Sequence, residues 1–417
     1  MGDDLVVGLD IGTSKVCAVI GEHNEAGELE ITGVGKSPSS GLRKGVVVNI
    51  EAVLNSILQA VEAAEMMSGH VVNGCWAGIG GSHIESLISR GVVAVNGKNR
   101  EQREISREDV ERVLEAARAV DFSADRQILD VIPQTYKVGD QEGIRDPLDM
   151  IGVRLECEVN IITCSGTGAQ NLVKCVNRAG FHVEGLILHT LAAGRAVLSP
   201  EEKELGVVLI DLGGGTTNVL VYHNGAPCLT ASIPVGGAQV TGDISIVKNV
   251  STETAEKIKV EAGCCWEDLL ENDEEIIVPG MGGRPPFPVS RCHIAEIIRP
   301  RMEETFSMVK ERLAKLNIHK PIGAGIVLTG GGANLMGAAN LAASVFNMPV
   351  RVGIPLAVGG LVDDYRDSMY ATAVGLVLEG NDRSVGKTSG SGAPAVNERA
   401  APSVITRIVN WVRKEFY

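Results

Sequence analysis

The sequence predicts an α/β fold with two similar lobes, and three observations support this prediction. At 417 residues the chain exceeds one ordinary hydrophobic core, so two to four domains are expected. Residues 207–222, VVLIDLGGGTTNVLVY, read as a β-hairpin in which a Gly-rich turn separates two strands. Residues 5–21, LVVGLDIGTSKVCAVIG, repeat that plan, and the offset of about 200 residues is far beyond a solenoid period, which indicates two similar domains.

The composition argues against several classes of protein, among them nucleic-acid-binding and disulfide-rich proteins. With 44% apolar residues the chain can fold, and its formal charge of −14 argues against nucleic-acid binding, which needs clustered Lys and Arg. Nine cysteines form an odd number without a C-x-x-C pair or paired His ligands. We therefore expect buried, reduced thiols in a cytosolic protein rather than a disulfide framework or a metal site.

Each hairpin offers the chemistry of a phosphate site. Glycine lets a turn adopt positive φ and lets a ligand approach the backbone closely. Successive N–H groups in such a turn form a concavity that binds anions, and neighbouring hydroxyls add donors. Asp10 and Asp211, which precede the turns, can hold a hydrated Mg²⁺, a cation that takes few carboxylates. Two such hairpins facing one another would clamp a polyphosphate from both sides.

A third glycine-rich element lies at residues 323–346, where a strand leads into three glycines and then an Ala/Leu-rich helix. Bare glycines at a helix start suit a flat ring or a phosphate. Two competing phosphate motifs fail on spacing. Residues 35–37, GKS, end like a Walker A loop, but Glu30 stands where its first glycine should be. Residues 78–83, GIGGSH, lack the last glycine of a dinucleotide-binding turn.

In this order, the three elements resemble the phosphate-1, phosphate-2 and adenosine motifs of the actin, Hsp70 and sugar-kinase ATPase superfamily. Within it the chain is similar to the bacterial cell-division FtsA family, through LDIGTSKV, ETAEKIKVEAG, VPGMGGRPP, AGIVLTGGGA and a basic tail with a Trp. The resemblance implies ATP and Mg²⁺ as cofactors, with Asp10 and Asp211 at the metal. The implied nucleotide-binding residues are Asp10, Gly12, Thr13, Ser14, Lys15, Asp211, Gly213, Gly214, Gly215, Thr216, Thr217, Gly237, Glu256, Lys259, Gly330, Gly331, Gly332 and Asn334.

Two helices that would join the lobes, at residues 188–198 and 368–378, carry small residues where they would cross. In hydrolysing relatives the first helix supplies a Gln or Glu that orients the attacking water, and the resemblance puts His189 or Thr190 at that position. Neither is an obvious replacement, and we expect His189 to be a packed or hydrogen-bonded histidine rather than a base. We therefore predict tight ATP binding with slow or absent turnover.

The resemblance implies an actin-like two-lobed ATPase fold with an inserted 1C subdomain and a C-terminal amphipathic helix. The implied subdomains are 1A (1–84, 162–192 and 357–380), 1C (85–161), 2A (193–242 and 320–356) and 2B (243–319). In 1C the sequence predicts a helix capped by Ser106 and then a strand, ILDVIPQTYKV. We interpret 1C as an interaction module for downstream division proteins; an inert structural insert is the alternative.

The last 37 residues predict a tether and a membrane anchor. Residues 381–402 contain no Leu, Ile or aromatic residue and are rich in Gly, Ser, Ala and Pro, which predicts a flexible linker. Residues 403–417, SVITRIVNWVRKEFY, then predict an amphipathic helix lying in a membrane interface with its cations on anionic lipid. Docking back onto the globular part is the alternative. The expected membrane residues are Val404, Ile405, Arg407, Ile408, Val409, Trp411, Val412, Arg413, Lys414 and Phe416.

Two pairs of charged residues have competing interpretations. Glu256 and Lys259 share one face of a helix that begins near Ser251, and the resemblance makes them adenosine and ribose contacts. A solvated ion pair is the alternative. Arg299 and Arg301 lie on a long helix at 293–316, near where the resemblance places binding of the C-terminal peptide of the tubulin-like GTPase FtsZ. They could equally be solvated helix charges.

The resemblance implies an ATP-binding cell-division protein that self-associates and tethers FtsZ polymers to the membrane at the division septum. The resemblance implies head-to-tail filaments, recruitment of later division proteins and a location at the cytoplasmic face of the inner membrane. A small-molecule kinase of the same fold is the alternative, but it needs a base near the γ-phosphate, and only Thr-Thr-Asn follows Gly215. A chaperone-like ATPase would need a peptide-binding domain, for which too few residues follow position 380.

Overall fold

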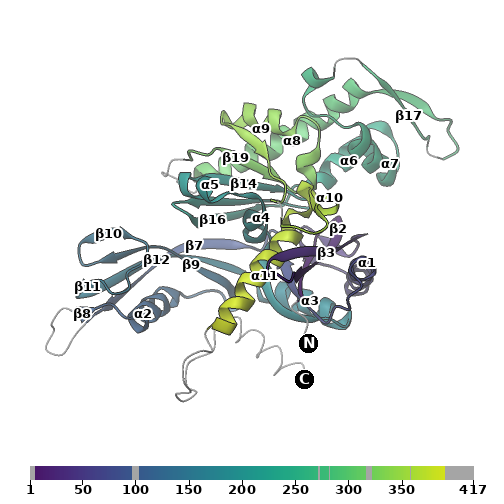
Figure 1. Ribbon diagram of the computed structural model, residues 1–417. Coiled ribbons are helices and arrows are strands. Elements are labelled where there is room, and N and C mark those ends of the chain that lie inside the picture. The colour runs from purple at the N-terminus through teal and green to yellow at the C-terminus, as the bar shows by residue number, and fades with distance from the viewer. Residues whose placement is uncertain are drawn as a thin grey trace.

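The computed structural model describes residues 5–95, 103–270, 273–280, 282–315, 322–356 and 358–389. Two lobes, each built around a five-stranded sheet, lie against each other, and a smaller four-stranded sheet extends to one side (Figure 1). We call the lobe that contains the first hairpin lobe I and the lobe that contains the second hairpin lobe II. The predicted α/β class is confirmed.

The sheet of lobe I has the strand order β13-β6-β1-β2-β3. Its strands are β1 (Val6–Ile11), β2 (Lys15–His23), β3 (Leu29–Pro38), β6 (Gly74–Ile79) and β13 (His182–Leu188). The first three pair antiparallel, whereas β6 runs parallel to β1 and β13 runs parallel to β6. Helices α1 (Ile50–Ser68) and α3 (Gly166–Arg178) cover part of this sheet. Every residue of β1 is buried, as expected for a strand covered on both faces.

The sheet of lobe II repeats this arrangement with the order β16-β15-β14-β19-β20. Its strands are β14 (Val207–Leu212), β15 (Thr217–His223), β16 (Ala226–Ile233), β19 (Ile326–Thr329) and β20 (Val350–Val352). The first three again pair antiparallel, and the last two again run parallel to the strand before them. The matching order and directions confirm the prediction of two similar domains.

Two helices cross between the lobes. Helix α4 (His189–Val197) follows the last strand of lobe I but packs on β14 and β15 of lobe II, and α11 (Ala371–Ser389) returns to pack on β1, β2 and β6 of lobe I. A methyl group added at Gly375 would lie 1.8 Å from the backbone oxygen of Ala192. The predicted close crossing at small residues is therefore confirmed.

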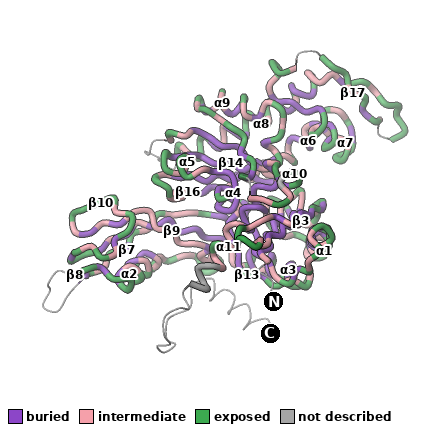
Figure 2. Tube along the Cα trace, in the orientation of Figure 1, coloured by how far each residue is buried: buried purple, intermediate pink, exposed green. Residues whose placement is uncertain are grey.

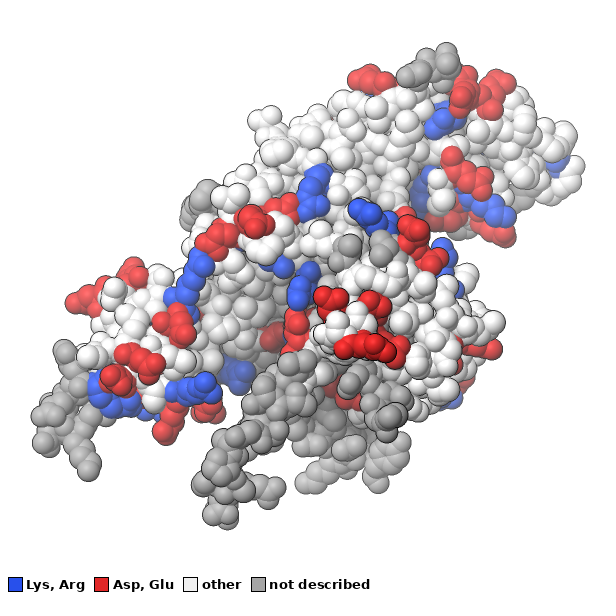
Figure 3. Space-filling view, in the orientation of Figure 1, with Lys and Arg blue, Asp and Glu red and all other residues white. Residues whose placement is uncertain are grey.

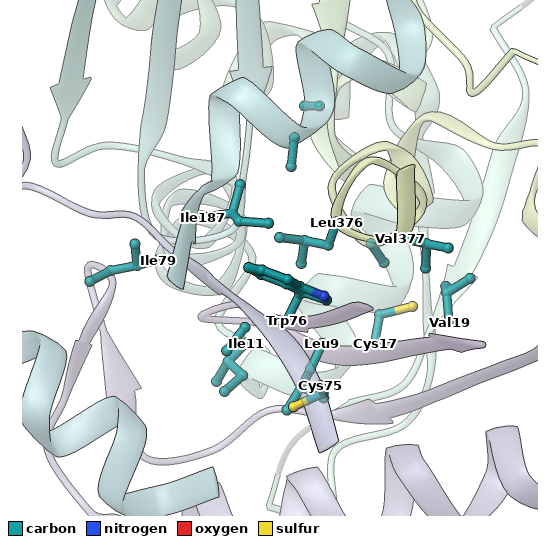
Figure 4. Packing of buried hydrophobic residues seen from close by; sticks show 14 of the residues in the cluster. Leu9, Ile11, Cys17, Val19, Cys75, Trp76, Ile79, Ile187, Leu376 and Val377 are labelled. Carbon is teal, nitrogen blue, oxygen red and sulfur yellow. The ribbon is translucent and has the colours of Figure 1, made fainter. Parts of the chain in front are cut away.

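The core of lobe I lies on both faces of its sheet, against α1 and α3 and against α11. Figure 4 shows Trp76 of β6 beside Leu376 of α11, with Leu9 and Cys17 nearby. Buried residues concentrate in the two sheets and in α4 (Figure 2). Seven of the nine cysteines are buried, as predicted, and burial raises the pKa of the Cys17 and Cys75 thiols to about 12, so these thiols stay protonated.

A small subdomain is inserted between β6 and α3. Its sheet has the order β10-β9-β12-β7, with β7 (Glu85–Ala94), β9 (Arg126–Val138), β10 (Gln141–Ile144) and β12 (Arg154–Ser165). Helix α2 (Arg107–Arg118) packs on one face of this sheet, and two short strands, β8 (Arg103–Glu104) and β11 (Ile151–Gly152), pair beside it. Ser106 caps α2, and β9 contains the predicted strand, so both local predictions in this region are confirmed.

The inserted subdomain contacts both lobes. Ser86 Oγ on β7 donates to the backbone oxygen of Thr230 and accepts from its N–H, each at 3.1 Å. The amides of Gln134 and Asn160 both donate to the backbone oxygen of Pro227, at 2.9 and 3.1 Å. All of these acceptors lie on β16, the edge strand of the lobe II sheet. The insert, which extends from lobe I and contacts β13 and α3 there, is therefore also bonded to the edge strand of lobe II.

Lobe II carries its own extension between β16 and β19. It consists of α6 (Gly237–Lys248), α7 (Thr252–Ala262), α8 (Arg291–Lys315) and the two-stranded sheet of β17 (Glu275–Val278) and β18 (Phe287–Ser290). The remaining elements are α9 (Ala338–Phe346), which contacts β20, and the short elements α5 (Pro200–Leu205), α10 (Val362–Tyr365), β4 (Leu42–Arg43) and β5 (Val46–Val47). On the face in Figure 3, acidic and basic side chains are interspersed.

Two predicted subdomain boundaries fall within helices: the boundary between 192 and 193 lies in α4, and the boundary between 242 and 243 lies in α6. The division into subdomains remains a prediction. The linker prediction was wrong for residues 381–389, because α11 continues to Ser389. Composition missed this extension because tertiary contacts stabilise it: Arg383 pairs with Asp130 of β9 at 2.9 Å, and Gly380 packs against Trp76. The rest of the predicted linker and the predicted amphipathic helix lie outside the described residues.

Candidate nucleotide site between the lobes

The two glycine-rich hairpins have the same backbone geometry. In the first, the N–H of Gly12 donates to the backbone oxygen of Lys15 at 2.9 Å; in the second, the N–H of Gly213 donates to that of Thr216 at 3.0 Å. Asp10 and Asp211 occupy equivalent positions, one residue before the end of β1 and β14. The equivalence that the sequence predicted therefore extends to the turn hydrogen bond.

The two turns face each other across the boundary between the lobes. A methyl group added at Gly214 would lie 1.8 Å from Ser14 Oγ, and one added at Gly215 would lie 2.7 Å from Thr13 Oγ1. The turn of lobe I thus presents hydroxyl side chains where the turn of lobe II presents bare backbone. The structure brings the predicted pair of loops together. That these loops bind phosphate remains a prediction.

The two aspartates form a buried acidic pair. Each is 7% exposed, and burial raises the pKa of the Asp211 carboxyl, an effect that nearby His189 and a hydrogen bond from Asn218 oppose. Among the described residues, no group of three or more His, Cys, Asp or Glu side chains is arranged so that it could hold a metal ion. Two carboxylates fit Mg²⁺ nonetheless, because this ion keeps several waters and also binds substrate phosphates.

Lys15, which follows the first turn, contacts the 3-10 helix Ser368–Tyr370, which leads into α11. Its ammonium donates to the backbone oxygen of Met369 and lies 5.1 Å from the centre of the Tyr370 ring. Thr13 Oγ1 accepts from the N–H of Gly45 at 3.3 Å. Sequence reasoning missed Tyr370, Met369 and Gly45, because they are distant in sequence and carry no motif.

Glu256 and Lys259 lie beside the second turn. Lys259 Nζ donates to Glu256 Oε2 at 2.7 Å, to Thr241 Oγ1 at 3.0 Å and to the backbone oxygen of Gly237 at 3.3 Å. The N–H of Gly237 in turn donates to the backbone oxygen of Gly213 at 2.9 Å. The two interpretations of this pair are therefore compatible, since it is an ion pair and it also adjoins the candidate phosphate loop.

The third glycine-rich element contacts the second hairpin. Gly330 has a φ of 80°, and a methyl group added there would lie 2.3 Å from Asp211 Oδ1. Gly331 has no neighbour within 4 Å of such a methyl group, so its surface is open. Asn334 donates to Asp367 Oδ1 at 2.7 Å and accepts from Ser368 Oγ at 2.7 Å. This element lies where a ligand in the cleft could contact bare backbone.

The predicted helix start at these glycines was wrong. The 3-10 helix Gly331–Asn334 follows β19, and α9 begins only at Ala338. The left-handed backbone of Gly330 and of Gly337, with φ of 80° and 83°, prevents a continuous helix across this segment.

Arg299 and Arg301 already have partners. Arg299 lies over the Trp266 ring at 5.5 Å and 3.8 Å from Glu267 Oε1. Arg301 on α8 donates to both carboxylate oxygens of Asp243 on α6, at 2.7 and 3.2 Å. Beside this pair an open groove of about 560 Å³ runs between α6 and α8. Its lining consists of Asp243, Ile246, Val247, Glu296, Ile297, Pro300, Arg301 and Glu304.

The predicted membrane contacts, at positions 404–416, lie outside the described residues. Within the ranges that the structure describes, we find no helix with the length and apolar character needed to span a bilayer.

Comparisons with known proteins agree with this architecture. A family model described as "Cell division protein FtsA" matches residues 208–375, and one described as "SHS2 domain inserted in FTSA" matches residues 81–163, which contain the predicted insertion. The chain is 44% identical to Cell division protein FtsA of Pseudomonas aeruginosa over 99% of this chain and 98% of that protein. It is 48% identical to the protein of the same description from Borreliella burgdorferi, over 91% of each.

Solved structures share the fold at lower identity. The PilM-PilN type IV pilus biogenesis complex matches with a TM-score of 0.66 and 17% identity, over 90% of this chain and 98% of that one. MreB5 of Spiroplasma citri bound to ADP matches with a TM-score of 0.53 and 15% identity, over 93% and 99%. The two-lobed architecture is therefore the actin-like one.

Proposed function

Because the chain belongs to the FtsA family of cell division proteins, we propose that it binds Mg²⁺-ATP between its lobes and tethers the tubulin-like FtsZ ring to the membrane. It would self-associate head to tail, so that many weak anchors act together at the cytoplasmic face of the division site. The inserted subdomain would recruit later division proteins. The observation that carries the nucleotide part is the contact between Ser14 of one turn and Gly214 of the other.

The residues present fit a polyphosphate with one divalent cation. Bound ATP would supply the phosphate chain that two facing backbone turns can grip, and Mg²⁺ would compensate its charge. Asp10 and Asp211 would hold the hydrated cation, and Lys259 and Glu256 would lie on the nucleoside side near Gly237. In support, the related fold of MreB5 of Spiroplasma citri has been solved with ADP and with AMPPNP.

We expect ATP turnover to be slow or absent. His189 and Thr190 begin α4 at the position where hydrolysing relatives carry Gln or Glu. A chain that retains ATP can hold its lobes in one arrangement for long periods. That behaviour suits a scaffold that assembles with nucleotide bound.

The groove between α6 and α8 is the proposed site for the C-terminal peptide of FtsZ. Ile246 and Val247 are 76% and 55% exposed, so they offer apolar contacts that a peptide could cover. Arg301 lies on the same groove and could exchange its bond to Asp243 for a carboxylate of the peptide. An Arg301→Glu variant should lose binding of the FtsZ tail peptide, measured by fluorescence anisotropy, whereas normal binding would remove this site.

The membrane part of the proposal is tested by co-sedimentation with anionic liposomes. The full chain should pellet with the liposomes, and a chain truncated at Pro402 should remain in the supernatant. Adding ATP should increase pelleting of the full chain only, because self-association multiplies weak anchors. Equal pelleting of the two chains would rule out the anchor.

A further inference from the structure

The His189 ring fills a space that is left open by two glycines without side chains. A methyl group added at Gly78 would lie 2.5 Å from His189 Cδ2, and one added at Gly80 would lie 2.6 Å from His189 Nδ1. Both glycines stand at the end of β6, next to β13, from which α4 and His189 continue. The glycine-rich stretch at residues 78–81, which does not fit a dinucleotide motif, therefore has a steric role. It leaves room for an imidazole ring at the edge of the cleft.

The outer ring nitrogen of this histidine has no hydrogen-bond partner among the described residues. His189 Nε2 is buried and lies 3.5 Å from Asp10 Oδ1, with the side chain 13% exposed. Buried polar atoms are nearly always paired in native proteins. The placement of this nitrogen beside Asp10 indicates that a small change in the cleft would complete a bond between the two side chains.

The two equivalent aspartates differ in their neighbours. Opposite Asp211 in the hairpin ladder is Asn218, whose amide donates to Asp211 Oδ2 at 3.3 Å. The residue opposite Asp10 is Cys17, a protonated thiol buried in the core, which offers no comparable donor. His189 Nε2 reaches Asp10 from another element. His189 is therefore placed to supply Asp10 with the donor that Asn218 supplies to Asp211.

We propose that His189 is a positioning residue for the cation site, where its Nε2–H holds the carboxylate of Asp10 as the amide of Asn218 holds that of Asp211. This inference rests on the proposed function, because it assigns a role within the Mg²⁺-ATP site. In this role His189 acts through Asp10 rather than by binding the nucleotide. It would fix the orientation of the Asp10 carboxylate, and hydrogen-bond partners of this kind typically contribute about 10- to 100-fold to metal affinity.

The test is a Mg²⁺ titration of the full chain with a fluorescent ATP analogue, read as the Mg²⁺ concentration that gives half-maximal binding. His189→Ala should raise this concentration about tenfold, and Asn218→Ala should raise it by a similar factor. His189→Gln, which keeps an N–H donor of similar reach, should restore most of the loss. Gly78→Ala, which displaces the ring but keeps the imidazole, should behave like His189→Ala. His182→Ala, at an exposed histidine on β13, is the control and should leave the value unchanged.

Each outcome separates this inference from the proposed function. If the unaltered chain binds no analogue with or without Mg²⁺, both are overturned. Analogue binding with the same Mg²⁺ dependence in the unaltered chain and in His189→Ala overturns the role of His189 alone. A loss in His189→Ala that His189→Gln does not reverse also overturns it, because packing rather than a hydrogen bond would then explain the loss. Circular dichroism of each variant checks that the fold is kept.

Discussion

The two lobes share a sheet order and a turn hydrogen bond, yet their turns differ at two positions. The turn of lobe I has the hydroxyl side chains of Thr13 and Ser14 where the turn of lobe II has Gly214 and Gly215. These turns touch, hydroxyl against bare backbone. Two identical turns would either collide through their side chains or leave a gap. The side chains of the first hairpin therefore explain Gly214 and Gly215 of the second, whereas Gly213 is the counterpart of Gly12 in the shared turn.

The crossing helices show the same pairing of unlike residues. Helix α4 follows the last strand of the lobe I sheet, and α11 comes after the last strand of the lobe II sheet. The two helices therefore occupy equivalent positions in the chain. At their crossing, Gly375 of α11 lies against the backbone of Ala192, whereas Gly194 of α4 faces β15, where an added methyl group would lie 3.2 Å from the Tyr222 ring. Backbone cannot rotate away, but a ring can shift slightly. The two glycines should therefore differ in their tolerance of substitution.

Gly375→Ala should have the largest effect on stability. The added methyl group would lie 1.8 Å from the backbone oxygen of Ala192, and overpacking of this kind costs about 3 kcal/mol when neither side can move. Gly194→Ala should cost about 1 kcal/mol, since only the Tyr222 ring must shift. The midpoint of urea unfolding measures both variants.

Gly242→Ala is the control for these substitutions. Gly242 lies within α6 with no neighbour within 4 Å of an added methyl group, so alanine should raise stability by about 0.5 to 1 kcal/mol. Equal losses for Gly375→Ala and Gly194→Ala would contradict the difference between a backbone neighbour and a ring neighbour.

Acid should destabilise the insertion of lobe I through Asp109. The Asp109 side chain in the insertion has no exposed surface; burial raises its pKa, but hydrogen bonds from Arg103 and Ser106 outweigh this and bring it to about 2. Because the folded pKa lies below the unfolded one, the stabilisation is complete above about pH 4 and is lost as pH falls towards 2. The loss should be about 2 kcal/mol, from 1.36 kcal/mol per pKa unit.

Thermal unfolding of the inserted subdomain, followed between pH 5 and pH 2, measures this loss. Asp109→Asn should be destabilised already at neutral pH and should show a flatter dependence below pH 4. Asp243→Asn is the matched variant in lobe II. Its carboxylate pairs with Arg301 and is 28% exposed, so at neutral pH this variant should lose less stability than Asp109→Asn. A larger loss at neutral pH from Asp243→Asn than from Asp109→Asn would reverse this part of the comparison.

The sequence predicted the repeated hairpins and the features that depend on short local patterns. The two hairpins, the small residues of the crossing helices, the cap at Ser106 and the strand that became β9 all follow from short patterns, and the structure has them. It could not predict that Lys15 contacts Tyr370 or that Gly78 and Gly80 hold the ring of His189, because these contacts join distant segments. Composition also failed at residues 381–389, where an ion pair and packing on Trp76 continue a helix through polar residues.

Gly214→Ala should weaken nucleotide binding about tenfold. The added methyl group would collide with Ser14, and although Oγ can rotate, Ser14 Cβ would remain at 2.8 Å, so the turns must separate slightly. Ser14→Gly removes the opposing side chain. The double variant should therefore regain part of the affinity that Gly214→Ala loses, measured with a fluorescent ATP analogue.

The prediction is tested by the energetic coupling between Gly214 and Ser14, which is the difference between the effect of the double variant and the sum of the single effects. If the losses in the single variants simply add, the two turns do not meet in the binding-competent state. A double variant that binds better than Gly214→Ala alone supports the pairing of unlike turns that the two lobes display.

The smallest expected effect concerns the extra length of α11. Helix α4 has 9 residues and α11 has 19, and the added turns carry Arg383, which pairs with Asp130 of the insertion and with Glu379. Arg383→Ala should cost about 1 kcal/mol, because the Arg383 side chain is 18% exposed and both partners are partly shielded. Arg195→Ala, which removes an ion pair to Asp382 whose side chains are 44% and 51% exposed, should cost less. Hydrogen exchange should locate the loss from Arg383→Ala in the last turns of α11 and in β9. Exchange that changes only at α11 would mean that the insertion does not depend on this helix.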